Sequence, residues 1–148
     1  MRKGSSRDGC DCLGALAPHA HRIDILGTDV TAHADEGVFW LTITGRLTGA
    51  VALAIVDQFY PQVERRNIVW DMTAARIELT ETDLGEIARR AARRLTVVRQ
   101  RKTACVVGSA DAFVPLWKYV NAAFVAGVPA EYSVFVGADK ARAWLAQG

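Results

Sequence analysis

Apolar and polar residues alternate along two early segments of the chain, a period of two that is typical of strands with one buried face. The first segment is interrupted at Gly27, where a bulge or a turn is expected. A tight turn at residues 35–37 separates it from a second strand over 38–44, which Gly45 ends. The two segments predict an antiparallel hairpin at the start of a sheet. Their apolar positions are Ile23, Ile25 and Val30, followed by Phe39, Leu41 and Ile43.

Helix and strand patterns then alternate to the end of the chain. Apolar residues spaced three and four apart predict helices, and the short apolar runs between them predict strands covered on both faces. Strands joined by helices form parallel crossover connections, so the pattern predicts an α/β fold with a mixed sheet. The first expected elements are a helix from Gly49 that kinks or restarts at Pro61, a strand at 67–71, a loop at 72–79 and a helix at 80–98. They are followed by a strand at 103–108, a helix with Pro115 in or just before its first turn and its end at Gly127, a strand at 132–136 and a final helix ending at Leu145.

Composition changes this picture mainly at the N-terminus. A chain of 148 residues suits one domain, and residues 1–21 are polar and glycine-rich without periodicity. We therefore expect a flexible tail over 1–21 and a domain over 22–148. The basic N-terminus lacks the apolar segment of a signal peptide, no window is apolar enough for a membrane helix, and the cysteines number three. These features predict a cytoplasmic protein without a transmembrane segment.

Cysteines and histidines in the tail raise the question of a metal site. Cys10 and Cys12, with His19 and His21, offer the thiolate and imidazole ligands that zinc prefers. Their spacing does not match the usual zinc-binding pairs, and their surroundings offer no core that would preorganise four ligands. The favoured interpretation is a tail without a metal, and no cofactor is expected.

A basic helix is the strongest surface signal. Between Arg76 and Lys102, eight basic residues stand against four acidic ones, although the whole chain carries a formal charge of only +2. The simplest interpretation is a solvated helix whose charges complement its dipole. The alternatives are a surface for an acidic partner protein, for an anionic lipid surface or for RNA. No aromatic residues interleave with the arginines, so specific nucleic-acid binding is not expected. The candidate partner surface is Arg89, Arg90, Arg93 and Arg94.

The carboxyl ends of the predicted strands form a second candidate site, because ligands of open α/β sheets bind at that edge. Asp71 is the one carboxylate expected near the centre of this rim, and its simpler role is to accept hydrogen bonds from its own loop. The candidate rim residues are Arg46, Thr48, Asp71, Thr73 and Ser109.

The sequence shows no set of residues arranged for catalysis. Cys105 lies in the middle of a predicted strand, and the three histidines fall in the tail or on the opening strand. The chain has no nucleophile elbow and no phosphate-binding loop, so we expect no catalytic residues and no enzymatic activity. The four tryptophans are interpreted as core residues, with Trp40 partly exposed.

Several short segments resemble the STAS superfamily, the domains of sulfate transporters and anti-sigma-factor antagonists. The similarity spans about residues 23–146 and is greatest to small stand-alone bacterial proteins described as anti-sigma-factor-antagonist-like. It implies a STAS-like mixed sheet with an N-terminal hairpin, followed by parallel strands with crossover helices. The segments are Gly45-Arg46-Leu47-Thr48, Val69-Trp70-Asp71, Ala104-Cys105-Val106-Val107, and Phe135 with Ala141-Arg142-Ala143-Trp144-Leu145.

The resemblance implies a non-enzymatic interaction or regulatory module. In partner-switching members, a kinase phosphorylates a serine in an Asp-Ser-Ser/Thr-Gly segment at the start of a helix. The equivalent segment here is 80–83, in which Thr82 is the candidate phosphoacceptor. Glu81 and Asp83 place negative charge beside it, which opposes a phosphate.

A partner protein, acidic if the basic helix binds it, is therefore expected, and a homodimer is an alternative. The rival function is a carrier of a small apolar ligand or lipid, because STAS domains share their plan with CRAL-TRIO lipid-transfer domains. A large apolar cavity between the sheet and the helix at 116–124 would favour the carrier, and a filled core would favour the module. An enzyme ranks third.

Overall fold

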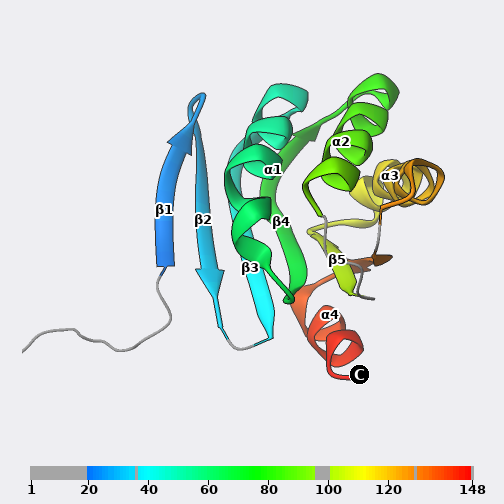
Figure 1. Ribbon diagram of the computed structural model, residues 1–148. Helices are drawn as coiled ribbons and strands as arrows, with labels where there is room; N and C mark the ends of the chain where they lie inside the picture. Colours follow the sequence, from blue (N-terminus) through cyan, green and yellow to red (C-terminus); the bar gives the residue numbers. More distant parts are fainter. Residues whose placement is uncertain (1–19, 36, 96–100, 129, 148) are drawn as a thin grey trace, which may run out of the picture.

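Six strands of the described residues form one sheet in chain order (Figure 1). The computed structural model describes residues 20–35, 37–95, 101–128 and 130–147. The first three strands pair with one another in antiparallel fashion, and from the third strand onward each strand pairs in parallel with the next. The fold is therefore the predicted mixed α/β sheet. The strands are β1 (Ala20–Ile25), β2 (Thr28–Ala34), β3 (Val38–Thr48), β4 (Asn67–Glu78), β5 (Lys102–Val107) and β6 (Glu131–Val136).

Helices cover the two faces of the sheet unequally. Three helices lie side by side on one face, and the last helix lies apart from them (Figure 1). The larger core forms under the three helices, and a smaller one joins the last helix to the opposite face of β4 and β5. The helices are α1 (Gly49–Val63), α2 (Glu81–Arg94), α3 (Phe113–Ala126) and α4 (Ala138–Leu145), with a 3₁₀ turn, η2 (Ala110–Ala112), before α3.

The first predicted strand is two strands, which corrects the sequence-based expectation. Leu26 and Gly27 have φ angles of 52° and 87° and form a two-residue turn between β1 and β2. Ile23 lies opposite Val30. The apolar residues that were assigned to a single strand therefore face each other across a hairpin. β1 begins at Ala20, two residues before the predicted domain boundary. The predicted tail at 1–19 lies outside the described residues.

A second correction concerns β3 and β4, which run further than predicted. Gly45 does not end β3, and the expected loop at 72–79 is mostly strand. Residues 44–48 pair in parallel with 74–78 after a register shift between Thr42 and Thr44. Gly45 takes a φ of 111°, which glycine adopts without strain, so the chain continues through the irregularity.

The predicted starts of α1 and α2 are confirmed. The Thr48 hydroxyl accepts a hydrogen bond from the Val51 amide at 3.3 Å and caps α1. Thr80 and Asp83 form a reciprocal capping box on α2. Pro61 lies in the last turn of α1, which continues to Val63. The predicted extension of α2 beyond residue 95 lies outside the described residues.

Candidate protein-docking groove

The predicted strand-end rim is divided between two separate groups of contacts. Because β4 continues to Glu78, Asp71 and Thr73 lie along the strand rather than at its end. Arg46 and Thr48 lie opposite the last residues of β4. Ser109 follows β5, which ends beside Met72. The five residues therefore do not converge on one crevice.

Hydrogen bonds to neighbouring groups occupy the Asp71 carboxylate. One oxygen accepts from the Thr73 amide at 3.2 Å and from the Thr73 hydroxyl at 2.8 Å. The other accepts from the indole N–H of Trp40 at 3.4 Å. Arg142 stacks 4.6 Å above the Trp40 ring, on the face that α4 shares. These contacts favour the local structural role for Asp71.

Ion pairs likewise hold the rim residues at the carboxyl ends of β3 and β4. Arg46 binds Glu78 with a shortest distance of 2.7 Å, and Arg76 lies 3.8 Å from the same carboxylate. The hydrogen bond from Arg46 lowers the pKa of Glu78. The Arg46 side chain thus ties β3 to β4 across the sheet surface.

The four arginines of the basic helix divide into two pairs. Arg90 and Arg94 both bind Asp57 of α1, the latter through two hydrogen bonds of 3.0 and 3.1 Å. The hydrogen bond from Arg90 is the largest influence on the Asp57 carboxyl and lowers its pKa, which burial opposes and Arg94 lowers further. Arg89 and Arg93 are exposed. The first pair joins two helices, and the second is available at the surface.

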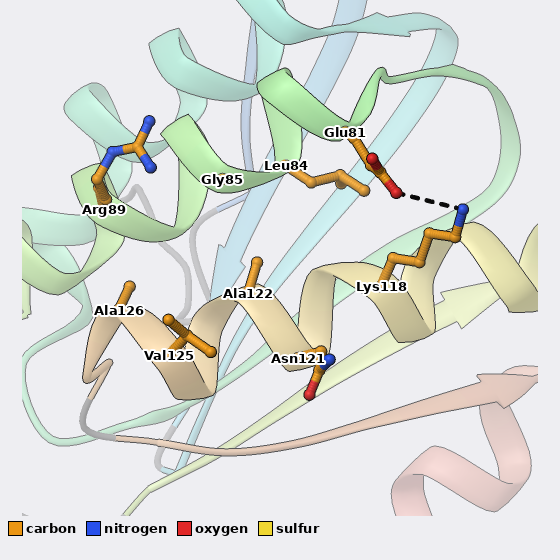
Figure 2. A pocket seen from close by; sticks show the side chains of 9 residues that line it. All are labelled: Glu81, Leu84, Gly85, Arg89, Lys118, Asn121, Ala122, Val125 and Ala126. Carbon is orange, nitrogen blue, oxygen red and sulfur yellow. Dashed lines mark ion pairs between the residues drawn. The ribbon is translucent and has the colours of Figure 1, made fainter.

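A groove lies between α2 and α3 (Figure 2). Its volume is about 580 Å³. At one end Lys118 and Glu81 form an ion pair of 3.5 Å across the groove, and Arg89 lies at the other end. Small side chains along both helices leave the space open. The lining residues are Glu81, Leu84, Gly85 and Arg89 of α2, and Lys118, Asn121, Ala122, Val125 and Ala126 of α3.

Large apolar side chains on α3 face solvent rather than the core, which corrects the interpretation of Trp117 as a core residue. Trp117 is 43% exposed, and Phe124 and Val125 are more than 80% exposed. The core side of α3 is instead formed by Leu116, Tyr119 and Ala123. The signal was present in the sequence, since α3 is apolar around nearly its whole circumference and one face of a helix suffices for a core.

Thr82 lies close to this groove. It is the exposed second residue of α2 and directly follows Glu81. Thr80 supplies the cap, so the Thr82 side chain is not needed to start the helix. Its role as a phosphoacceptor stays a prediction.

The space between the sheet and α3 is almost completely filled. A cavity there holds about 20 Å³, enough for one water molecule at most. Pockets that bind small molecules usually measure about 300–1,000 Å³. The walls are Leu47, Ala52, Trp70, Met72, Leu79, Leu84, Ile87, Cys105, Leu116 and Tyr119.

Burial also decides the chemistry of Cys105, which lies in β5. Cys105 is 2% exposed, and burial raises the pKa of its thiol to about 12. A thiol that stays protonated at neutral pH is a poor nucleophile. In the part of the chain that the structure describes, no three His, Cys, Asp or Glu residues are grouped so as to hold a metal ion. Cys10, Cys12 and His19 lie outside it.

Comparisons with known proteins give one similarity of overall shape. No family model matches the chain. No curated protein matches it either. A solved structure is similar over 89% of this chain and 99% of its own, with 13% identity and a TM-score of 0.49. It is described as an uncharacterized protein of the DUF3478 family with a SpoIIAA-like fold, from Shewanella loihica PV-4. Within the described residues, none of the helices combines the length and apolar character that a membrane crossing needs.

Proposed function

We propose that the chain is a non-enzymatic, cytoplasmic interaction module, of the regulatory kind that its sequence resembles, and that it binds an acidic helical segment of a partner protein in the α2–α3 groove. The observation that carries this proposal is an open groove over a filled core. The groove offers about 580 Å³ at the surface, whereas the cavity beneath α3 offers about 20 Å³.

The shape of the groove favours a helical segment. Two helices with small residues along their facing sides form a trough into which the apolar face of a third helix can pack. Leu84, Ala122 and Val125 supply apolar contact on both sides. The exposure of Val125, 82%, leaves this surface without a partner in the isolated chain.

The charges around the groove favour an acidic segment. Arg89 lines one end, and Arg93 is exposed one helical turn further along α2. Arg90 and Arg94 are engaged with Asp57, so they hold the helix in place and contribute less to an incoming partner. Arg89 and Arg93 form no ion pair with any residue that the structure describes, so carboxylates on the partner would complement them and speed association at low salt.

The rival function, a carrier of an apolar ligand, finds less support. A lipid chain needs a cavity many times larger than the 20 Å³ beneath α3. An exposed groove with an ion pair at one end is a wetter and more polar site than such a ligand requires.

Site-specific photocrosslinking in the native host tests the proposal. A photoreactive residue at Asn121, on the groove wall, should capture a partner that the same group at Lys140 on α4 does not capture. Arg89→Glu should weaken the capture several-fold, because the reversed charge repels an acidic segment. Lys140→Glu is the matched control, since Lys140 is also an exposed basic helical residue. Equal capture at the two positions, or none at Asn121, would contradict the proposal.

A further inference from the structure

β6 is an edge strand of the sheet that the described residues form, and some of its backbone groups point away from β5 in a regular pattern. The sheet ends at β6, whose only neighbour among the described strands is β5. At the two ends of this pair, the Glu131 amide donates to Arg101 O at 2.7 Å and the Gly137 amide donates to Val107 O at 3.2 Å. Since the pattern repeats every two residues, odd-numbered residues bond to β5. The N–H and C=O groups of Tyr132, Val134 and Val136 therefore face outward.

This edge lacks the features that usually prevent strand pairing. Edge strands are commonly protected by charged side chains, proline or bulges. β6 carries one charged residue, Glu131, at its very start, and no proline or lysine. β1, at the opposite edge, carries the exposed charges of Arg22 and Asp24 and so differs in this respect.

An apolar strip on α3 accompanies the open edge. Trp117 and Phe124 are seven residues apart and so lie on one side of the helix. The groove residues Lys118, Ala122 and Val125 lie on another side, facing α2 (Figure 2). α3 is the last helix of the row in Figure 1 and packs against β6 through Tyr119 and Tyr132, so its remaining flank has no neighbour in the row.

The exposed area is sufficient to contribute to a dimer but not to form one alone. Trp117, 43% exposed, and Phe124, 84% exposed, together present about 250 Å² per copy. Two copies supply about 500 Å², whereas stable interfaces begin near 1,200 Å² in total. Pairing of two six-residue strand edges is needed to supply much of the remainder.

We propose that two copies of this chain associate about a two-fold axis through β6, which joins their sheets into one. The β6 strands pair antiparallel with Val134 opposite Val134 of the second copy, and Tyr132 opposite Val136 of the second copy. This register pairs outward-facing residues with one another and keeps the helix-covered faces on the same side. Trp117 and Phe124 then pack across the axis against the second copy. The inference goes beyond the proposed function, because the α2–α3 groove stays open to a partner in each copy.

Light scattering and amide hydrogen exchange of the full chain test the dimer. The protein should have twice the 16.1 kDa mass of one chain. Phe124→Glu should reduce the mass to that of one chain, because it places a charge in the strip without disturbing the core. The matched control is Val125→Glu, one residue along the helix and equally exposed at 82%, but on the groove side. This control should stay dimeric while it loses the crosslinked partner.

Hydrogen exchange distinguishes strand pairing from contact through α3 alone. In the unsubstituted protein, the amides of Tyr132, Val134 and Val136 should exchange as slowly as those of Ser133 and Phe135. In the Phe124→Glu monomer, the first three should exchange at least tenfold faster while the other two stay protected. A mass of one chain for the unsubstituted protein overturns the dimer. Fast exchange at the three outward amides in a dimer overturns the pairing, as does equal loss of the dimer in both variants.

Discussion

At the scale of single residues, Gly49 links the two helices that begin at adjacent strand ends. A β-carbon at Gly49 would collide with the Asp83 carboxylate, which forms half of the capping box of α2. The start of α1 is thus packed directly against the cap of α2, and only glycine leaves room for that carboxylate.

Gly49→Ala should lower the free energy of unfolding by about 0.5–2 kcal/mol, because Asp83 must leave its capping position. Helix propensity alone would make Gly49→Ala more stable, because alanine forms helices better than glycine. A loss of stability would therefore point to the displaced Asp83 carboxylate. Gly85→Ala is the control, since its β-carbon would meet only the flexible end of Arg89 at 3.4 Å. Urea unfolding should show Gly85→Ala to be more stable than the unsubstituted protein. A stabilised Gly49→Ala would contradict the packing described.

Cys105 gives a pH-dependent prediction at the same scale. The buried thiol keeps its proton to a pKa of about 12, whereas the unfolded chain loses it near the ordinary value of 9.0. The folded state therefore holds a proton that the unfolded state releases, and this contribution to stability falls as the pH rises above 9.0. At pH 8, mass spectrometry should find Cys105 unmodified by iodoacetamide until the protein is unfolded. Rapid modification of Cys105 in the native protein would show that it is accessible.

At the scale of elements, the clamp between α1 and α2 depends on one aspartate and two arginines. The double variant Arg90→Glu/Arg94→Glu should lower the free energy of unfolding by about 1–3 kcal/mol, since it places three carboxylates together. Arg89→Glu/Arg93→Glu is matched to it, because each pair includes one arginine of the last turn. The control should lose only the dipole effect, about 0.3–1 kcal/mol per residue. Equal losses in urea unfolding would mean that Asp57 does not join the helices.

Acid should remove the contribution of the Asp57 carboxylate to the free energy of unfolding. Its pKa is lowered in the folded state, so its contribution is present above the ordinary value of 3.8 and is lost as the pH falls below it. The stability of Asp57→Asn should therefore differ from that of the unsubstituted protein at neutral pH and approach it in strong acid.

The elements also show what the sequence could and could not predict. Helix caps and apolar periodicity were enough to locate α1 and α2. Thr48, Thr80 and Asp83 form their capping hydrogen bonds with residues three positions away in the chain, so the pattern is local. The extension of β4 to Glu78 was missed, because residues 74–78 are held by pairing with 44–48, some thirty residues away in the chain. The groove was missed for a similar reason. Gly85 and Ala122 line it only because α2 and α3 lie side by side in the fold.

At the scale of the whole molecule, the two faces of the sheet differ in use. The face under α1–α3 holds the main core and presents the groove, while α4 covers part of the other face through Phe135 and Trp144, whose ring centroids lie 5.4 Å apart. Because the cavity beneath α3 holds about 20 Å³, protein purified from its native host should release no stoichiometric lipid on organic extraction. One lipid per chain, detected by mass spectrometry, would instead support the carrier.

An NMR titration with the crosslinked partner shows whether that partner binds in the α2–α3 groove. The backbone amides of Gly85, Arg89, Ala122 and Val125 should shift on binding, and those of α4 should not. Added salt should weaken the affinity, because exposed charges are screened. Shifts confined to Asp71, Thr73 and the face under α4, with the groove amides unchanged, would contradict binding in the groove. They would place the binding site on the strands.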